Sequence, residues 1–178
     1  RESVVCLIPG NLPDEIMASI KLDALDVKIL AAIQREGRIT KLALAERVGL
    51  SPTPCWVRLK KLETAGIVTG YEARLDMRLV AKVTTVMVEV TLGHHRQGDF
   101  ERFERSVKET PAVVACWAVG GGVDYILKVV APDVDAYQRL VDSWLEREIG
   151  IARYFTYIVT RTVKEAVDPP VDAVAAGS

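Results

Sequence analysis

The chain has 178 residues, of which 49% are hydrophobic and 26% are charged, and its formal net charge is −1. This composition is typical of a folded soluble protein and excludes a disordered or fibrous chain. The sequence contains neither the roughly 20-residue apolar run of a membrane-spanning helix nor the pattern of a signal peptide. We therefore expect a cytoplasmic protein with one domain of average size or two small ones.

Charge is distributed unevenly along the chain. Residues 18–75 carry ten lysines and arginines against six aspartates and glutamates, whereas residues 76–178 carry twelve against fifteen. A basic N-terminal part beside a mildly acidic remainder predicts that the first part binds an anionic partner.

The cysteines and histidines predict neither disulfides nor a metal site. Cys6, Cys55 and Cys116 lie far apart and are odd in number, and the chain has only two histidines, His94 and His95. Such a set is a poor disulfide framework and lacks the paired spacing of a zinc site. We expect reduced thiols and no cofactor.

The first residues differ from those that follow. Residues 1–16 hold two prolines and no periodic apolar pattern, whereas Met17 resembles a natural start. We expect residues 1–16 to be a weakly ordered extension without function.

The first two helices are predicted by apolar spacing and by capping residues. Apolar residues recur from Leu22 with the period of an amphipathic helix that ends at Gly37. Thr40 is a candidate N-cap for a second helix, and Gly49 ends that helix because glycine readily takes a left-handed conformation. A tight glycine turn after the second helix is typical of a helix-turn-helix unit, which we assign to residues 17–75.

The third helix begins within the string "GLSPTPCWVRLKKL" and runs to about residue 65. Ser51–Pro52 and Thr53–Pro54 each form an N-cap followed by a proline at the first helical position, where the missing N–H is harmless. Either pair can start the helix, and the other would stiffen its approach. A short strand or wing is expected over residues 67–75.

This third helix has a core side and a cationic side. Cys55, Leu59 and Leu62 recur at helical spacing and are predicted to face the core, with Trp56 at the rim. The side chains that point elsewhere are Val57, Arg58, Lys60 and Lys61. Either they form a solvated face, or they enter a DNA major groove, where Val57 touches thymine methyl groups and Arg58 reads guanine or a phosphate.

After residue 76 the pattern changes to strands and helices. We expect a linker at 76–82, then strand, helix, strand, strand, helix and strand at 84–92, 98–109, 112–119, 123–131, 133–148 and 153–164. This order predicts a ferredoxin-like βαββαβ domain over residues 83–166, so the fold class is α+β. The helices of that fold cover one face of the sheet, and we expect the other face to form a homodimer. Residues 167–178 are expected to be a flexible tail.

A glycine triplet, Gly120–Gly121–Gly122, lies between two of the predicted strands. A phosphate-binding loop is excluded, because no GxxxxGK[ST] motif is present and no helix follows. The triplet is either a plain tight turn or a small-ligand site in which backbone N–H groups bind the ligand and Asp124 accepts from an ammonium group.

No residue pattern predicts catalysis. His94 and His95 lie in a polar loop and are expected to face solvent, and the chain offers no serine–histidine–acid set. We expect a protein that is not an enzyme.

Several strings resemble one known family. "LSPTPCWVRLKKLETAGIVTGYEARLD", "VGGGVDYILKVVAPDVDAYQRLV" and "FTYIVTRTVK" closely resemble the Lrp/AsnC (leucine-responsive/asparagine-responsive) transcription regulators of bacteria and archaea, over roughly residues 20–165. The resemblance implies a winged helix-turn-helix domain that binds double-stranded DNA and a ferredoxin-like domain that senses an amino acid. It also implies a homodimer built through the sheet faces, which often assembles into tetramers or octamers.

The resemblance indicates which residues are functional. The recognition helix and the start of the preceding helix give the DNA-binding candidates Thr40, Lys41, Ser51, Pro52, Thr53, Trp56, Val57, Arg58, Lys60 and Lys61. In the family, effectors bind between dimers near the glycine-containing turn. By position, that gives the effector-binding candidates Gly120, Gly121, Gly122, Val123, Asp124 and Tyr157.

Two positions differ from the family pattern. Gly121–Gly122 stands where the family often has Gly-Asp, which removes a carboxylate beside the ligand site. Val57 stands where relatives commonly have a polar or charged residue, so we expect a different operator sequence. Two other functions remain open: a nucleoid-type architectural DNA-binding protein, and a metabolic amino-acid-binding protein without a DNA role.

Overall fold

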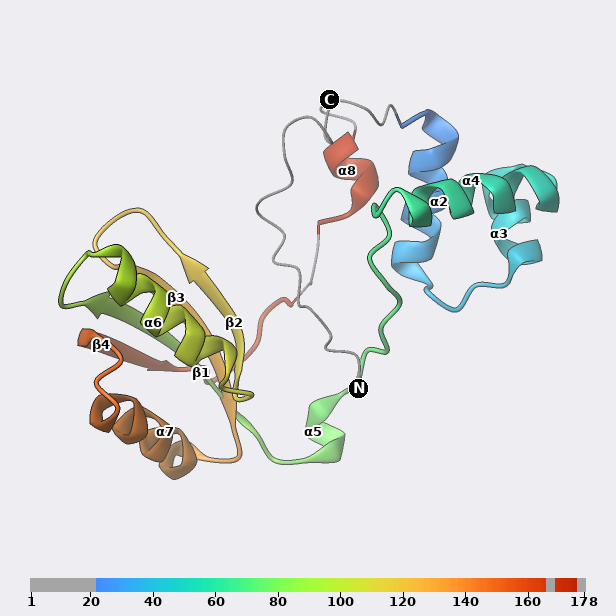
Figure 1. Cartoon of the computed structure of the whole chain (residues 1–178). Coiled ribbons are helices and arrows are strands. Elements are labelled where there is room, and N and C mark those ends of the chain that lie inside the picture. Colours follow the sequence, from blue (N-terminus) through green and yellow to red (C-terminus); the bar gives the residue numbers. More distant parts are fainter. Residues whose placement is uncertain (1–21, 166–168, 176–178) are drawn as a thin grey trace, which may run out of the picture. The chain divides into compact units, whose positions relative to one another are not determined.

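The protein consists of two compact units, seen in a computed structural model that describes residues 22–165 and 169–175 (Figure 1). Among the described residues, one unit comprises 22–73 together with 169–175, and the other comprises 74–165. The extension expected at 1–16 lies outside the described residues. Over the described ranges, no helix has the length and apolar character needed to cross a membrane.

The first unit is built on three helices, α2 (Ala24–Arg35), α3 (Lys41–Val48) and α4 (Pro52–Thr64). Ile29 of α2, Ala45 of α3 and Cys55 of α4 meet in its core, each at most 1% exposed. A small alanine at this contact lets the helix backbones approach closely. The expected helix-turn-helix arrangement is confirmed.

Local capping explains where α2 and α3 begin and end. Asp23 accepts hydrogen bonds from the N–H groups of Leu25 and Asp26 at the start of α2. Thr40 Oγ1 accepts from the N–H of Ala43, 3.2 Å away, at the start of α3. Gly49 ends α3 with a φ of 73°, in the left-handed region that favours glycine.

Ser51–Pro52, not Thr53–Pro54, starts α4. Ser51 is the N-cap residue, although its hydroxyl makes no capping hydrogen bond, and its carbonyl accepts from the N–H of Cys55 at 3.3 Å. Both prolines therefore lie inside the first helical turn, where backbone N–H groups have no helical partner. Pro54 does not stiffen the approach to the helix; it belongs to the helix itself.

The expected short strand over residues 67–75 does not form. Within the described residues this segment contains neither helix nor strand, and hydrogen bonds to α4 hold its start and its middle. The Tyr71 hydroxyl donates to Glu63 Oε1 of α4 at 2.9 Å. The expected linker at 76–82 contains a one-turn helix, α5 (Met77–Val80).

The second unit has the expected βαββαβ order. It contains β1 (Thr84–Leu92), α6 (Gln97–Lys108), β2 (Val113–Ala118), β3 (Tyr125–Ala131), α7 (Val134–Glu146) and β4 (Ile151–Ile158). The strands form one antiparallel sheet in the order β2-β3-β1-β4. β4 begins two residues earlier and ends six residues earlier than expected. β4 pairs only with β1, and its last residue, Ile158, stands opposite Val86. β1 itself begins at Thr84, so it offers almost no further backbone for β4 to pair with.

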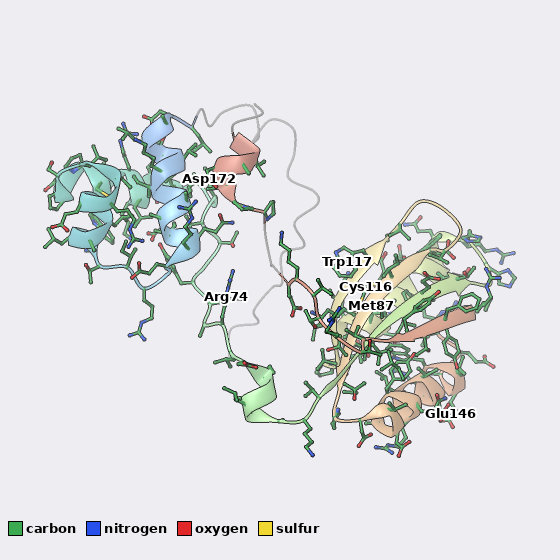
Figure 2. The ribbon with its side chains drawn as sticks, turned by 180° about the vertical axis from the view of Figure 1, so that it is seen from behind. Arg74, Met87, Cys116, Trp117, Glu146 and Asp172 are labelled. Carbon is green, nitrogen blue, oxygen red and sulfur yellow. The ribbon has the colours of Figure 1, made fainter. Side chains whose placement is uncertain are left out.

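The two faces of the sheet differ sharply in their surroundings. On one face, alternate residues of β1 and β3 such as Val88 and Leu127 pack against α6 and α7, where Phe103 and Trp144 are at most 1% exposed. The opposite face carries no helix of this unit. It presents large side chains that remain about half exposed: Trp117, Phe155 and Tyr157. Figure 2 shows Trp117 with Met87 at this part of the sheet.

Cys55 and Cys116 are free thiols, and Cys6 lies outside the described residues. Burial raises the pKa of the Cys116 thiol to about 11, so this thiol stays protonated at neutral pH. Among the described residues, no group of histidine, cysteine and acidic side chains is placed to hold a metal ion.

The C-terminal residues are not a structureless tail throughout. Residues expected to be flexible form α8 (Val171–Ala175), which packs against α2 and belongs to the first unit. Pro170 accepts hydrogen bonds from the N–H groups of Ala173 and Val174, so the two prolines at 169 and 170 precede a helical turn.

The Thr40 cap generates a stability prediction. Thr40→Ala removes the acceptor for the Ala43 N–H, and we expect it to destabilise the first unit by about 1 kcal/mol. Thr40→Ser is the matched control and keeps the stability near wild type. Urea unfolding followed by far-UV circular dichroism measures both. Equal midpoints for the two variants would show that the hydroxyl contributes nothing to the helix.

Candidate functional site

The exposed side of α4 is a continuous stripe. Thr53, Val57, Lys60 and Thr64 recur at the spacing of one helical face, opposite the buried stripe that includes Cys55. Val57 is 62% exposed. Val57 is thus an apolar side chain exposed to water at the centre of an otherwise polar helical face.

Trp56 lies at the edge of this stripe, and its ring makes cation–π contacts with two lysines. Lys41 Nζ lies 3.4 Å from the ring centroid, and Lys60 Nζ lies 5.0 Å from it. An aromatic ring attracts an ammonium group through its quadrupole and carries no net charge. The ring therefore positions Lys41 and leaves its charge in place. A carboxylate partner would neutralise that charge. This contact joins the start of α3 to α4.

Arg58 has a different environment from the one expected. Its guanidinium Nη1 pairs with Asp23 Oδ2 at 2.6 Å and with Asp26 Oδ1 at 2.8 Å. The hydrogen bonds to Asp26 and Asp23 raise the pKa of Arg58. A backbone hydrogen bond from Asp26, followed by the bond from Arg58, lowers the pKa of the Asp23 carboxyl. Arg58 thus joins α4 to the start of α2, and its expected role in reading guanine or a phosphate stays a prediction.

The remaining cations separate into paired and unpaired groups. Lys60 pairs with Glu63 at 2.7 Å, whereas Lys41 and Lys61 are exposed and have no carboxylate partner in the part of the chain that the structure describes. Only an unpaired cation offers its full charge to an anionic ligand. Of the ten residues expected to bind DNA, all but Trp56 and Arg58 are exposed around this stripe.

The glycine turn is open on its outer side. A Cβ placed on Gly120, Gly121 or Gly122 would meet no atom within 4 Å. Gly121 has a φ of 146°, which side-chain-bearing residues rarely adopt. The N–H of Val119 donates to the carbonyl of Asp124 at 3.0 Å and closes the turn between β2 and β3.

Asp124 is anchored rather than free. Its Oδ2 accepts from the N–H of Leu92 at 2.8 Å, and its Oδ1 lies 3.0 Å from His95 Nε2. The Asp124 side chain is only 19% exposed. These contacts tie the glycine turn to the end of β1, so the carboxylate is not the uncommitted acceptor that the sequence indicated. His95 is exposed in the loop before α6, as expected, and its ring centre lies 5.9 Å from that of Phe100.

Tyr157 does not join the glycine turn within one subunit. Along β1, Tyr157 stands opposite Met87, whereas Tyr125, next to the turn, stands opposite Val90. Three residues of strand correspond to roughly 10 Å, and β4 and β3 lie on opposite sides of β1. The Tyr157 hydroxyl instead donates to Glu89 Oε2 at 3.1 Å.

Comparison with known proteins agrees with both halves of this arrangement. Residues 22–69 match a family model described as winged helix-turn-helix DNA-binding, and residues 85–169 match the Lrp/AsnC ligand binding domain. The chain is 53% identical over 145 residues to the transcriptional regulatory protein DoeX of Halomonas elongata, covering 82% of this chain and 92% of that protein. It is 39% identical to the leucine-responsive regulatory protein of Escherichia coli, over 82% of this chain and 88% of that one.

Solved structures show the same similarity. A transcriptional regulator from Neisseria meningitidis in complex with L-Met has a TM-score of 0.80 and 34% identity, and the match covers 86% of this chain and 99% of that one. An AsnC family regulator from Agrobacterium tumefaciens gives the same TM-score and identity over 85% and 99%. With its winged helix-turn-helix DNA-binding domain followed by a ligand-binding domain, the chain belongs to the Lrp/AsnC family of transcriptional regulators.

Proposed function

We propose that the protein is a cytoplasmic regulator that recognises specific DNA sequences through the exposed stripe of α4. The observation that carries this proposal is Val57, exposed between Thr53 and Lys60 on that stripe. Phosphate contacts supply affinity without sequence preference, whereas contacts to base edges supply specificity. In this proposal Lys41 and Lys61 bind phosphates, and Val57 and Thr53 contact bases.

The proposal includes a homodimer formed through the open face of the sheet. Trp117, Phe155 and Tyr157 leave a large apolar surface on that face, and such a surface is typical of an interface. A two-fold dimer presents two copies of α4. Its operator should then hold two half-sites separated by about one helical turn, ~34 Å, or a multiple of it.

We further propose an amino acid as the effector, bound near the glycine turn. The support is the ligand-binding domain matched by residues 85–169 and the L-Met complex of the Neisseria meningitidis relative. The turn has open space beside Gly120, Gly121 and Gly122, and Asp124 ties the turn to the end of β1. In this proposal Tyr157 contributes only from another subunit, because it lies away from the turn of its own chain.

A second candidate is a nucleoid-type architectural protein. The unpaired Lys41 and Lys61 favour it, because phosphate contacts alone bind any DNA sequence. The two functions differ in sequence preference, which decides between them. A regulator binds the DNA beside its own gene more tightly than a scrambled sequence of equal length at physiological salt. Equal affinity for both would favour the architectural function.

The first DNA prediction separates phosphate contacts from structural cations. Lys61→Ala should weaken DNA binding and reduce the slope of log affinity against log salt by about one unit. Arg58→Ala should weaken binding through misplacement of α4 and leave that slope unchanged. Fluorescence anisotropy over a salt series measures both, with the exposed Lys28→Ala on α2 as the control for charge. An equal loss of slope in the Arg58 and Lys61 variants would contradict the structural role of Arg58.

The second DNA prediction concerns sequence reading. Val57→Ala should lower affinity for the preferred operator on the order of tenfold, as expected from losing two buried methyl groups. Affinity for scrambled DNA should not change, because phosphate contacts remain. Val57→Thr, nearly the same in shape but polar, tests whether the contact is apolar. If Val57→Ala weakens both DNAs equally, Val57 does not read the sequence.

The effector prediction separates anchoring from direct contact. Asp124→Ala should weaken binding of the best ligand, found by thermal-shift screening of the twenty amino acids, by about tenfold because the turn loses its anchor. Asp124→Asn keeps an oxygen for the Leu92 N–H and should retain binding within about threefold. Calorimetry measures both, and circular dichroism checks the fold. Equal losses in the two variants would show that the charge of Asp124 contacts the ligand.

A further inference from the structure

A second row of side chains runs along the flank of α4, beside the exposed stripe. Trp56, Lys60 and Glu63 recur at the spacing of successive helical turns. Lys60 belongs to both rows, because it also lies on the exposed stripe between Val57 and Thr64. The charge that Lys60 offers to a ligand of the stripe therefore depends on its contacts in the second row.

Glu63 is the carboxylate that neutralises Lys60. Its Oε2 lies 2.7 Å from Lys60 Nζ, one helical turn away. The Glu63 side chain is only 23% exposed, whereas the Lys60 side chain is 55% exposed. The carboxylate thus forms the shielded half of the pair, and the ammonium group forms the half that an anionic ligand can reach.

Tyr71 holds the other oxygen of this carboxylate. Its hydroxyl donates to Glu63 Oε1 at 2.9 Å, so both Glu63 oxygens have a partner. The Tyr71 ring lies against the turn after α2, where a Cβ placed on Gly37 would be 3.6 Å from Tyr71 Cδ1. An exposed ion pair usually contributes little, because both side chains lose freedom when they meet. Tyr71 reduces that loss by ordering Glu63 independently of Lys60.

The same row brings a second cation close to this pair. Lys41 Nζ and Lys60 Nζ both lie over the Trp56 ring, at 3.4 Å and 5.0 Å from its centroid. Two ammonium groups on one ring repel each other, and a carboxylate beside one of them offsets that repulsion. The hydrogen bonds from Lys60 and then from Tyr71 lower the pKa of the Glu63 carboxyl, so it is charged at neutral pH. Lys41, Lys60 and Glu63 together therefore carry one net positive charge instead of two.

We propose that Glu63 competes with DNA phosphates for Lys60 and thereby limits the affinity of α4 for DNA of any sequence. Tyr71 is the positioning residue that keeps the Glu63 carboxylate in place. A phosphate that reaches Lys60 must displace Glu63, so this contact contributes less than a contact with the unpaired Lys61. The competition rests on the proposed function, in which the exposed stripe of α4 binds DNA.

The competition is tested by fluorescence anisotropy over a salt series, with the DNA beside the gene and with a scrambled sequence. Glu63→Gln keeps the side-chain length and an oxygen for the Tyr71 hydroxyl, but it has no charge to hold Lys60. It should bind both DNAs about fivefold more tightly at about 0.15 M salt, with a slope of log affinity against log salt steeper by about one unit. Tyr71→Phe should change both quantities in the same direction and by less.

Two controls separate this competition from a general effect of charge. Glu46→Gln removes an exposed carboxylate of α3 that has no cationic partner among the described residues, and it should leave the slope unchanged. In a Lys60→Met background, Glu63→Gln should no longer change the slope, because no cation remains to be released. A slope that steepens equally in the Glu46 and Glu63 variants, or equally with and without Lys60, would overturn the competition.

The pair itself is tested without DNA. The pKa of the Glu63 carboxyl, followed by NMR through a pH titration of the full-length protein, should rise in Lys60→Met because the carboxylate loses its cation. Circular dichroism checks that the variant is folded. An unchanged pKa would show that Lys60 and Glu63 do not pair in solution, and it would overturn the competition whatever the DNA measurements give.

The outcomes also distinguish the competition from the proposed function. If Lys61→Ala flattens the salt slope and Glu63→Gln does not steepen it, α4 binds DNA and the competition is refuted. If neither variant changes the slope, the exposed stripe binds no phosphates and both proposals are refuted. A steeper slope in Glu63→Gln that requires Lys60 supports both.

Discussion

The placement of α4 depends on one cluster of charges, in which Arg58 reaches back across the domain to Asp23 and Asp26. Asp26 is 4% exposed, so its carboxylate needs a partner. The same two aspartates also form the reciprocal cap of α2. The Arg58 guanidinium therefore pairs with both carboxylates that cap α2 and links α4 to the start of that helix. The side chains that α4 presents outward take their position from this contact together with the packing of Cys55, Leu59 and Leu62 in the core.

The organisation of α4 follows from that anchoring. Its buried residues fill the core, Arg58 is committed to α2, and Trp56 orders Lys41 and Lys60 on its ring. What remains outward is a narrow stripe with an apolar centre. The ligand-binding unit is organised in a similar way. The Asp124 carboxylate contacts Leu92 and His95, and the glycine turn beside it is exposed. In both units, a charged residue that the sequence marked as a ligand contact forms contacts within the fold beside the candidate site.

Local patterns in the sequence predicted most elements and could not predict which residues meet. The capping role of Thr40, the left-handed Gly49 and the βαββαβ order depend on neighbouring residues, so they are visible in the chain itself. The pairing of Arg58 joins residues more than thirty positions apart, and a helical wheel alone places Arg58 on the outer side. Two aspartates at the start of α2, Asp23 and Asp26, could have indicated this pairing, since a buried carboxylate needs a cationic partner. The end of β4 and the docking of α8 depend on partners elsewhere in the fold, which no local pattern records.

The exposed Val57 has a thermodynamic consequence. Counterion release makes phosphate binding fade as salt rises, whereas the dehydration of an apolar side chain is insensitive to ionic strength or is strengthened by it. In the proposed function, where Val57 contacts bases, the affinity for random DNA therefore falls faster with rising salt than the affinity for the operator does. Discrimination between the two improves with ionic strength, and the burial of that surface leaves a negative heat-capacity change on association.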